Sequence, residues 1–168
     1  MSLDPLLSAP LAIQIHATSA TAAMLLGAVI LFRRKGTPAH KAMGRIWVGL
    51  MLIVATSAIF INEIRLVGPF SPIHLFVLLT YAGLWQAIRE IRRGNIQAHQ
   101  ATMKSVYLGA LLLTGAFTLL PGRRMHDVLF GADSGWLPSF VAIPLALAVT
   151  AYLWIRLVPR RRRRPLAT

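Results

Sequence analysis

The sequence contains no cysteine among its 168 residues. This absence excludes disulfide frameworks, iron–sulfur clusters, cysteine-based zinc sites and thiolate-ligated haem. Acidic residues are scarce as well, because only five Asp and Glu accompany 18 Lys and Arg. None of the five lies in a metal-binding motif beside the four regularly spaced histidines described below. Histidine is therefore the ligand type that the sequence offers.

Charged residues of both signs make up only 14% of the chain, whereas hydrophobic residues make up 56%. A soluble domain carries about 25% charged residues, and a membrane-spanning helix needs about 20 consecutive apolar ones. Apolar runs of about this length lie at residues 11–32, 42–61, 72–88, 101–120 and 136–155. Helices satisfy every backbone group within lipid, and the alternating pattern of a β-barrel is absent. We expect an all-α integral membrane protein with one transmembrane domain, residues 1–158, and a basic tail, residues 159–168.

The basic residues are segregated along the chain. Of the 18 Lys and Arg, five lie within residues 33–45, four within 89–104, six from Arg156 onward, and only three in the intervening loops. Lys and Arg are enriched in cytoplasmic loops. The pattern therefore predicts five spans in a bacterial inner membrane, with the N-terminus outside and the C-terminus in the cytoplasm. We expect the arginine-rich tail to contact anionic membrane lipid rather than nucleic acid.

Four of the five histidines recur near the starts of apolar segments: His16, His40, His74 and His99. The segment 33–43 reappears in degraded form at 92–103, where both copies contain a basic pair, a glycine and Ala-His-x-Ala. This similarity indicates an internal duplication, in which two parallel helical hairpins are related by an axis along the membrane normal. We expect a helical bundle with a four-helix core made of two repeated hairpins, and a peripheral fifth helix.

The duplication makes His16 equivalent to His74, and His40 equivalent to His99. Residues that face the axis of a four-helix bundle approach one another, so we expect an outer and an inner bis-imidazole site. Such sites suit haem b, whereas zinc requires four protein ligands or three plus water. Copper bound by the same histidines is an alternative, and so is a protein in which the histidines only form hydrogen bonds at the membrane interface.

Several polar residues near the two expected sites are candidate partners of a cofactor. Arg45 on the inner side and Arg123 on the outer side are the expected partners of haem propionates, because a guanidinium can pair with a carboxylate through two hydrogen bonds. Lys41 and Lys104 on the inner side are placed to pair with the propionates as well. His126 breaks the repeat, and we expect it in a solvated outer loop; contact with a quinone or a propionate is the alternative.

Two further patterns concern the helix ends. Thr37-Pro38 and Ser71-Pro72 each place a capping hydroxyl before a proline that begins a helix, and Asn95 is the expected cap before His99. The four tryptophans are expected to form interfacial belts and are assigned no chemistry: Trp47, Trp85 and Trp154 on the inner side and Trp136 on the outer side.

Three segments occur in this order: Ala39-His40-Lys41-x-x-Gly44-Arg45-Ile46-Trp47, Phe70-Ser71-Pro72-Ile73-His74-Leu75 and Leu120-Pro121-Gly122-Arg123. They resemble the hallmark segments of DUF2306, a bacterial membrane-protein family of unassigned function. The resemblance covers roughly residues 10–131. The chain is more loosely similar to the cytochrome b561 superfamily, which implies two haems b ligated by histidines from alternate helices of a four-helix core. The spacing departs from that pattern, because the histidines lie very near the helix starts.

The expected function is transmembrane electron transfer by a small dihaem b-type cytochrome with bis-histidine haems. A quinol or another small reductant would supply the electrons, which would make the protein a membrane oxidoreductase. Two other functions remain open. One is a copper- or zinc-binding membrane protein that uses the same histidines, and the other is a structural membrane subunit without a cofactor.

Overall fold

The structure is a computed structural model that describes residues 2–61 and 73–157, and the side chains of all of these except Ile73 and His74. This part of the chain is helical and contains no strand. Its α-helices are α1 (Asp4–Leu7), α2 (Leu11–Phe32), α3 (Pro38–Ile59), α4 (Ile73–Arg92), α5 (Ile96–Val106), α6 (Thr114–Ala116), α7 (Arg124–Phe130) and α8 (Leu137–Leu157). A π-helical segment, η1 (Tyr107–Leu113), joins α5 to α6, and the 3-10 turns are η2 (Phe117–Leu119) and η3 (Ala132–Ser134).

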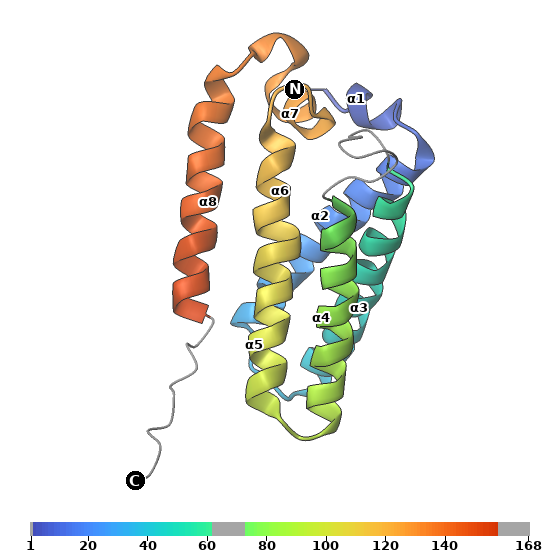
Figure 1. The fold of residues 1–168 in the computed structure, drawn as a ribbon, viewed down its shortest axis with the longest axis vertical. Coiled ribbons are helices and arrows are strands. Elements are labelled where there is room, and N and C mark those ends of the chain that lie inside the picture. Colours follow the sequence, from blue (N-terminus) through green and yellow to red (C-terminus); the bar gives the residue numbers. More distant parts are fainter. Residues whose placement is uncertain (1, 62–72, 158–168) are drawn as a thin grey trace.

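The helices α3, α4 and α8 and the stretch from α5 through α6 run along the long axis of the molecule, and α2 crosses them obliquely (Figure 1). The helix α2 packs against α3, α3 against α4, and α4 against α5, and η1 closes the core against α2. The helix α8 packs on η1 at the side of this core and buries only Ser139 and Thr150. The predicted all-α membrane bundle, with a core of two hairpins and a peripheral fifth helix, is confirmed.

Four helical stretches in the described residues are long and apolar enough to cross a membrane: Leu11–Phe32, Pro38–Ile59, Ile96–Leu119 and Leu137–Leu157. The helix α4 is not among them, because its second half carries Gln86, Arg89, Glu90 and Arg92. It nevertheless lies inside the core, where Leu84 and Ala87 are almost completely buried. The five-span topology stays a prediction, and the predicted tail, residues 159–168, lies outside the described residues.

The two copies of the repeated segment form two turns at the same end of the bundle (Figure 1). Gly36 and Gly94 have φ values of 84° and 75°, which an L side chain rarely adopts. The Thr37 side chain then accepts a hydrogen bond from the His40 backbone N–H, and the Asn95 side chain accepts one from Ala98. Both predicted caps are confirmed, whereas the cap predicted at Ser71 lies outside the described residues.

Candidate cofactor site at the basic end of the bundle

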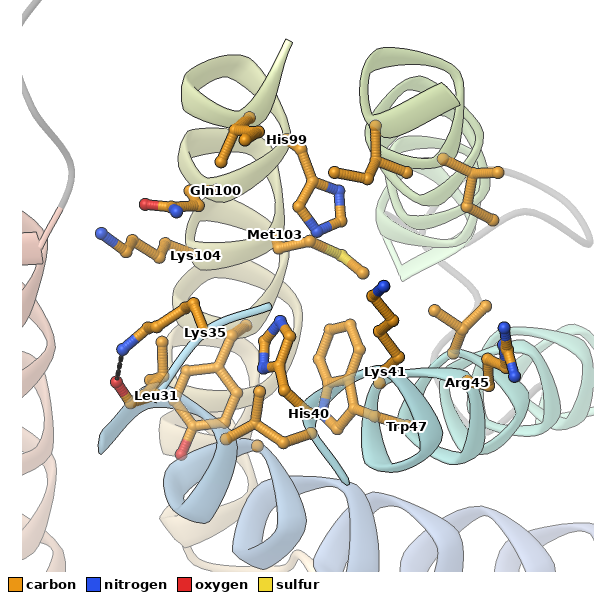
Figure 2. Close-up of a pocket in the computed structure, with 18 of the residues that line it drawn as sticks. Leu31, Lys35, His40, Lys41, Arg45, Trp47, His99, Gln100, Met103 and Lys104 are labelled. Carbon is orange, nitrogen blue, oxygen red and sulfur yellow. Dashed lines mark hydrogen bonds between the residues drawn. The ribbon is translucent and has the colours of Figure 1, made fainter. Parts of the chain in front are cut away.

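A cavity of about 670 Å³ lies at this end of the bundle, lined by residues of α2, α3, α4 and α5. Binding sites for small molecules usually enclose about 300–1,000 Å³. His40, from the first turn of α3, and His99, from the first turn of α5, both line the cavity, and their rings point into the same space (Figure 2). The structure thus brings together the two histidines of the repeated Ala-His-x-Ala segments.

The His99 ring is held in one orientation by the neighbouring helix. Its Nδ1 lies 2.9 Å from the backbone oxygen of Ala87. A carbonyl oxygen can only accept a hydrogen bond, so Nδ1 carries a proton and donates it. In the tautomer with this single proton, Nε2 has a free electron pair that can bind a ligand. Histidines that bind metals usually donate their second N–H in this way.

The His40 ring is held less completely. Its Nδ1 is buried, and within the described residues it is the one buried side-chain nitrogen or oxygen without a hydrogen-bond partner. Leaving a buried polar group unpaired costs about 1–3 kcal/mol. Only a bond to this nitrogen itself would remove that cost, because a ligand bound to Nε2 would leave Nδ1 unpaired.

Two aromatic side chains form the apolar floor of the cavity. Trp47 donates a hydrogen bond from Nε1 to the Ala23 oxygen, 2.9 Å away, and Tyr107 donates one from its hydroxyl to the Met24 oxygen, 3.1 Å away. Both rings lie against Gly27, where an added methyl group would come within 2.5 Å of Tyr107 and 2.8 Å of Trp47. Trp47 is 4% exposed, so its predicted place in an interfacial belt is wrong.

The polar lining of the cavity is strongly cationic. Among the described residues it includes no Asp or Glu, and its basic residues are Lys35, Lys41, Arg45, Arg92 and Lys104. Two of these amines are already engaged, because Lys35 donates to the Leu31 oxygen and Lys104 donates to the Leu157 oxygen, 2.9 Å away. The cavity is therefore electrostatically suited to a ligand with negative charge.

The two predicted propionate partners lie at opposite ends of the molecule. Arg45 lines the cavity, as predicted for the inner side. Arg123 precedes α7 and lies at the other end of the bundle, so it is not part of this cavity (Figure 1).

The predicted outer pair is only partly described. His16 of α2 donates from Nδ1 to the Val54 oxygen of α3, 3.0 Å away, and Ser57 Oγ lies 3.2 Å from the same nitrogen. This is the arrangement seen for His99. The side chain of His74 lies outside the described residues, so the pairing of His16 with His74 stays a prediction.

His126 is only 1% exposed, so the prediction of a solvated loop is wrong. It lies on α7, at the end of the bundle opposite the cavity (Figure 1). Its Nδ1 lies 3.0 Å from the Leu119 oxygen and 3.1 Å from Ser139 Oγ, and its Nε2 lies 3.0 Å from Ser134 Oγ. With both nitrogens engaged by the protein, His126 fixes α7 to the bundle and has no free nitrogen for a quinone or propionate.

Sequence reasoning missed several cavity residues, among them Trp47, Met103 and Tyr107. Met103 follows His99 by four residues, a spacing that places both on one face of a helix. That spacing was a usable signal. Trp47 and Tyr107 carried no such signal, because their inward orientation depends on the close approach of α2 at Gly27.

A family model described as a predicted membrane protein, DUF2306, matches residues 13–155. The matched range includes the three segments in which the resemblance was found. No curated protein and no solved structure matches the chain. The looser likeness to cytochrome b561 gains no support from these comparisons.

Proposed function

The chain belongs to DUF2306, a family of predicted membrane proteins, and we propose that it binds haem b and transfers electrons across the membrane. The observation that carries the proposal is the meeting of His40 and His99 in one cavity with an apolar floor and a cationic lining. Two imidazoles on one iron are a recognised way of holding haem b in a helical bundle.

The charge of the cavity favours haem over a free metal ion. At an effective dielectric constant of about 20, one positive charge 8 Å away raises the energy of a bound monovalent cation by roughly 2 kcal/mol. In the part of the chain that the structure describes, five basic side chains line this cavity without a carboxylate to offset them. Haem brings two propionates that such side chains can neutralise, whereas a copper or zinc ion brings only positive charge.

In this proposal the protein holds and shields the cofactor, which supplies the one-electron chemistry. His99, fixed by the Ala87 oxygen, and His40 would hold the haem iron. Trp47 and Tyr107 would exclude water from one side of the ring, and the basic residues would bind the propionates. His16, held by Val54, and His74 would bind a second haem near the other end, so that electrons from a quinol or another small reductant could cross the bilayer.

A second candidate function, copper binding, is favoured by one observation. The Met103 thioether lies beside His99 in the cavity (Figure 2), and two imidazoles with a thioether suit Cu(I). The basic lining opposes this candidate. The copper site and the haem site predict different effects of a substitution at Met103. Loss of Met103 would abolish copper binding but would leave haem ligation intact.

Absorbance spectra of the purified protein, from cells supplied with haem, test the proposal. We expect low-spin b-type bands and about two haems per chain. His40→Ala or His99→Ala should remove the inner haem or leave it five-coordinate and high-spin, and should spare the outer haem. His16→Ala or His74→Ala should do the reverse. His126→Asn is the matched control, because it removes a buried histidine far from the cavity; its haem content should be unchanged.

Two results would contradict the haem proposal. A colourless protein with stoichiometric copper that is lost in His40→Ala, His99→Ala and Met103→Leu would establish the copper site instead. A protein that holds neither haem nor metal would leave the histidines as structural hydrogen-bonding groups.

A further inference from the structure

The five basic residues of the cavity are not equivalent. The Lys35 and Lys104 amines donate to backbone oxygens. Lys41 has no hydrogen-bond or ion-pair partner among the described residues, and Figure 2 shows its amine pointing toward Met103 and His99, into the cavity. Arg45, one turn further along α3, points away toward the rim. Lys41 is therefore the cation best placed to meet a ligand inside the cavity.

The position of Lys41 is fixed by the same local structure that fixes His40. The two residues are adjacent in the first turn of α3, which the Thr37 cap and Pro38 begin. Lys41 and Arg45 are four residues apart, so they lie on the same face of the helix. An apolar body held between His40 and His99 would thus have an unpaired ammonium beside it and a guanidinium at the cavity mouth.

We propose that Lys41, assisted by Arg45, is the carboxylate-binding group of this cavity, and that the site selects amphiphiles with an apolar body and carboxylates. This inference deepens the proposed function, in which the carboxylates are the haem propionates. The sequence expectation included Lys41 among the inner propionate partners but favoured Arg45, whereas here Lys41 is the principal group. Lysine acts here as an exposed point charge directed at the cavity, whereas arginine at the rim offers two parallel hydrogen bonds.

Iron-free protoporphyrin IX and its dimethyl ester separate recognition of the carboxylates from ligation of iron. Neither compound forms axial bonds to histidine, and the ester lacks the negative charges. The full-length protein in nanodiscs of zwitterionic lipid would be titrated with each compound, and porphyrin fluorescence would give the dissociation constant. We expect the diacid to bind at least about tenfold more tightly than the ester, as one charge-assisted hydrogen bond contributes about 1.5–3 kcal/mol.

Substitutions then assign the preference to Lys41. Lys41→Ala should weaken diacid binding by about tenfold and leave ester binding unchanged. Lys41→Arg, which keeps the charge, should retain most of the affinity for the diacid. Arg34→Ala is the matched control, because Arg34 is exposed in the neighbouring turn but does not line the cavity. It removes the same charge and should change nothing.

The inference is overturned if diacid and ester bind alike, if neither binds, or if Arg34→Ala weakens diacid binding as much as Lys41→Ala. His40→Ala and His99→Ala should keep the preference for the diacid. A protein without haem bands that still prefers the diacid would therefore contradict the haem proposal but not the role of Lys41. A protein with haem bands but without that preference would contradict the role of Lys41 but not the haem proposal.

Discussion

At the scale of single residues, His40 and His99 occupy equivalent places in the two repeats but have different surroundings. The sequence predicted that they would meet, because the repeated segment keeps both in register with a helix start. It could not predict that the Ala87 oxygen would hold His99 while Nδ1 of His40 has no partner. Those surroundings come from backbone atoms of another helix, which no pattern within the repeat encodes. The same reason explains why the burial of His126 was missed.

Gly27 is the residue on which the cavity floor depends most directly. Gly27→Ala places a methyl group 2.5 Å from a ring carbon of Tyr107, which cannot yield without moving the ring. Overpacking of this kind costs about 1–3 kcal/mol of stability. We expect a lower unfolding temperature in detergent and an altered tryptophan fluorescence, because Trp47 also contacts this position. Gly49→Ala is the control, as nothing lies within 4 Å of a methyl group there; an equal effect of both variants would contradict the role of Gly27.

At the scale of helices and turns, the local signals of the sequence were informative. The caps at Thr37 and Asn95 and the two glycine turns follow from the residues themselves, because a hydroxyl or amide satisfies an N–H of the first helical turn. The π-helical segment from Tyr107 to Leu113 was not predicted. It is apolar on all sides, so its hydrophobic pattern has no period that distinguishes one helical register from another.

The Thr37 cap has a direct link to the cavity, because it accepts a hydrogen bond from the backbone of His40 itself. Thr37→Ala should lower the free energy of unfolding by about 1 kcal/mol and speed hydrogen exchange at the His40 amide. Thr37→Ser should behave like the natural protein. Thr21→Ala removes a hydroxyl that only bonds within α2 and serves as the control. Equal exchange at His40 in the alanine variants would show that the cap does not order this turn.

At the scale of the whole molecule, the bundle has one basic end. The turn between α2 and α3, the turn between α4 and α5, and the end of α8 all lie there (Figure 1). For the basic residues that the structure describes, the charge pattern of the sequence predicted this grouping, because the basic clusters recur after alternate spans. The cavity could not be predicted in the same way, since its volume depends on how far the four helices separate. The hydropathy of a helix shows that it is apolar, but it does not show how closely the helix packs against its neighbours.

The orientation of the bundle can be tested with reporter fusions. Because the basic clusters belong on the cytoplasmic side, a phosphatase fused after Thr168 should be inactive, and one inserted in the loop after α7, near Gly135, should be active. A reporter that is active only in the cytoplasm should give the opposite result at both positions. An active phosphatase at Thr168 would reverse the orientation and place the cavity on the outer side.

The basic lining of the cavity also bears on the direction of electron flow. Reduction removes one positive charge from haem iron. Nearby cations therefore destabilise the oxidised state more than the reduced state, and they raise the reduction potential. On the haem proposal, five basic side chains surround the inner cofactor. Within residues 2–61 and 75–157, His16 has no basic residue among its hydrogen-bond partners, which are Val54 and Ser57. The inner haem would then hold the electron more strongly, and a pair arranged in this way would carry electrons from the outer end of the bundle toward its basic end.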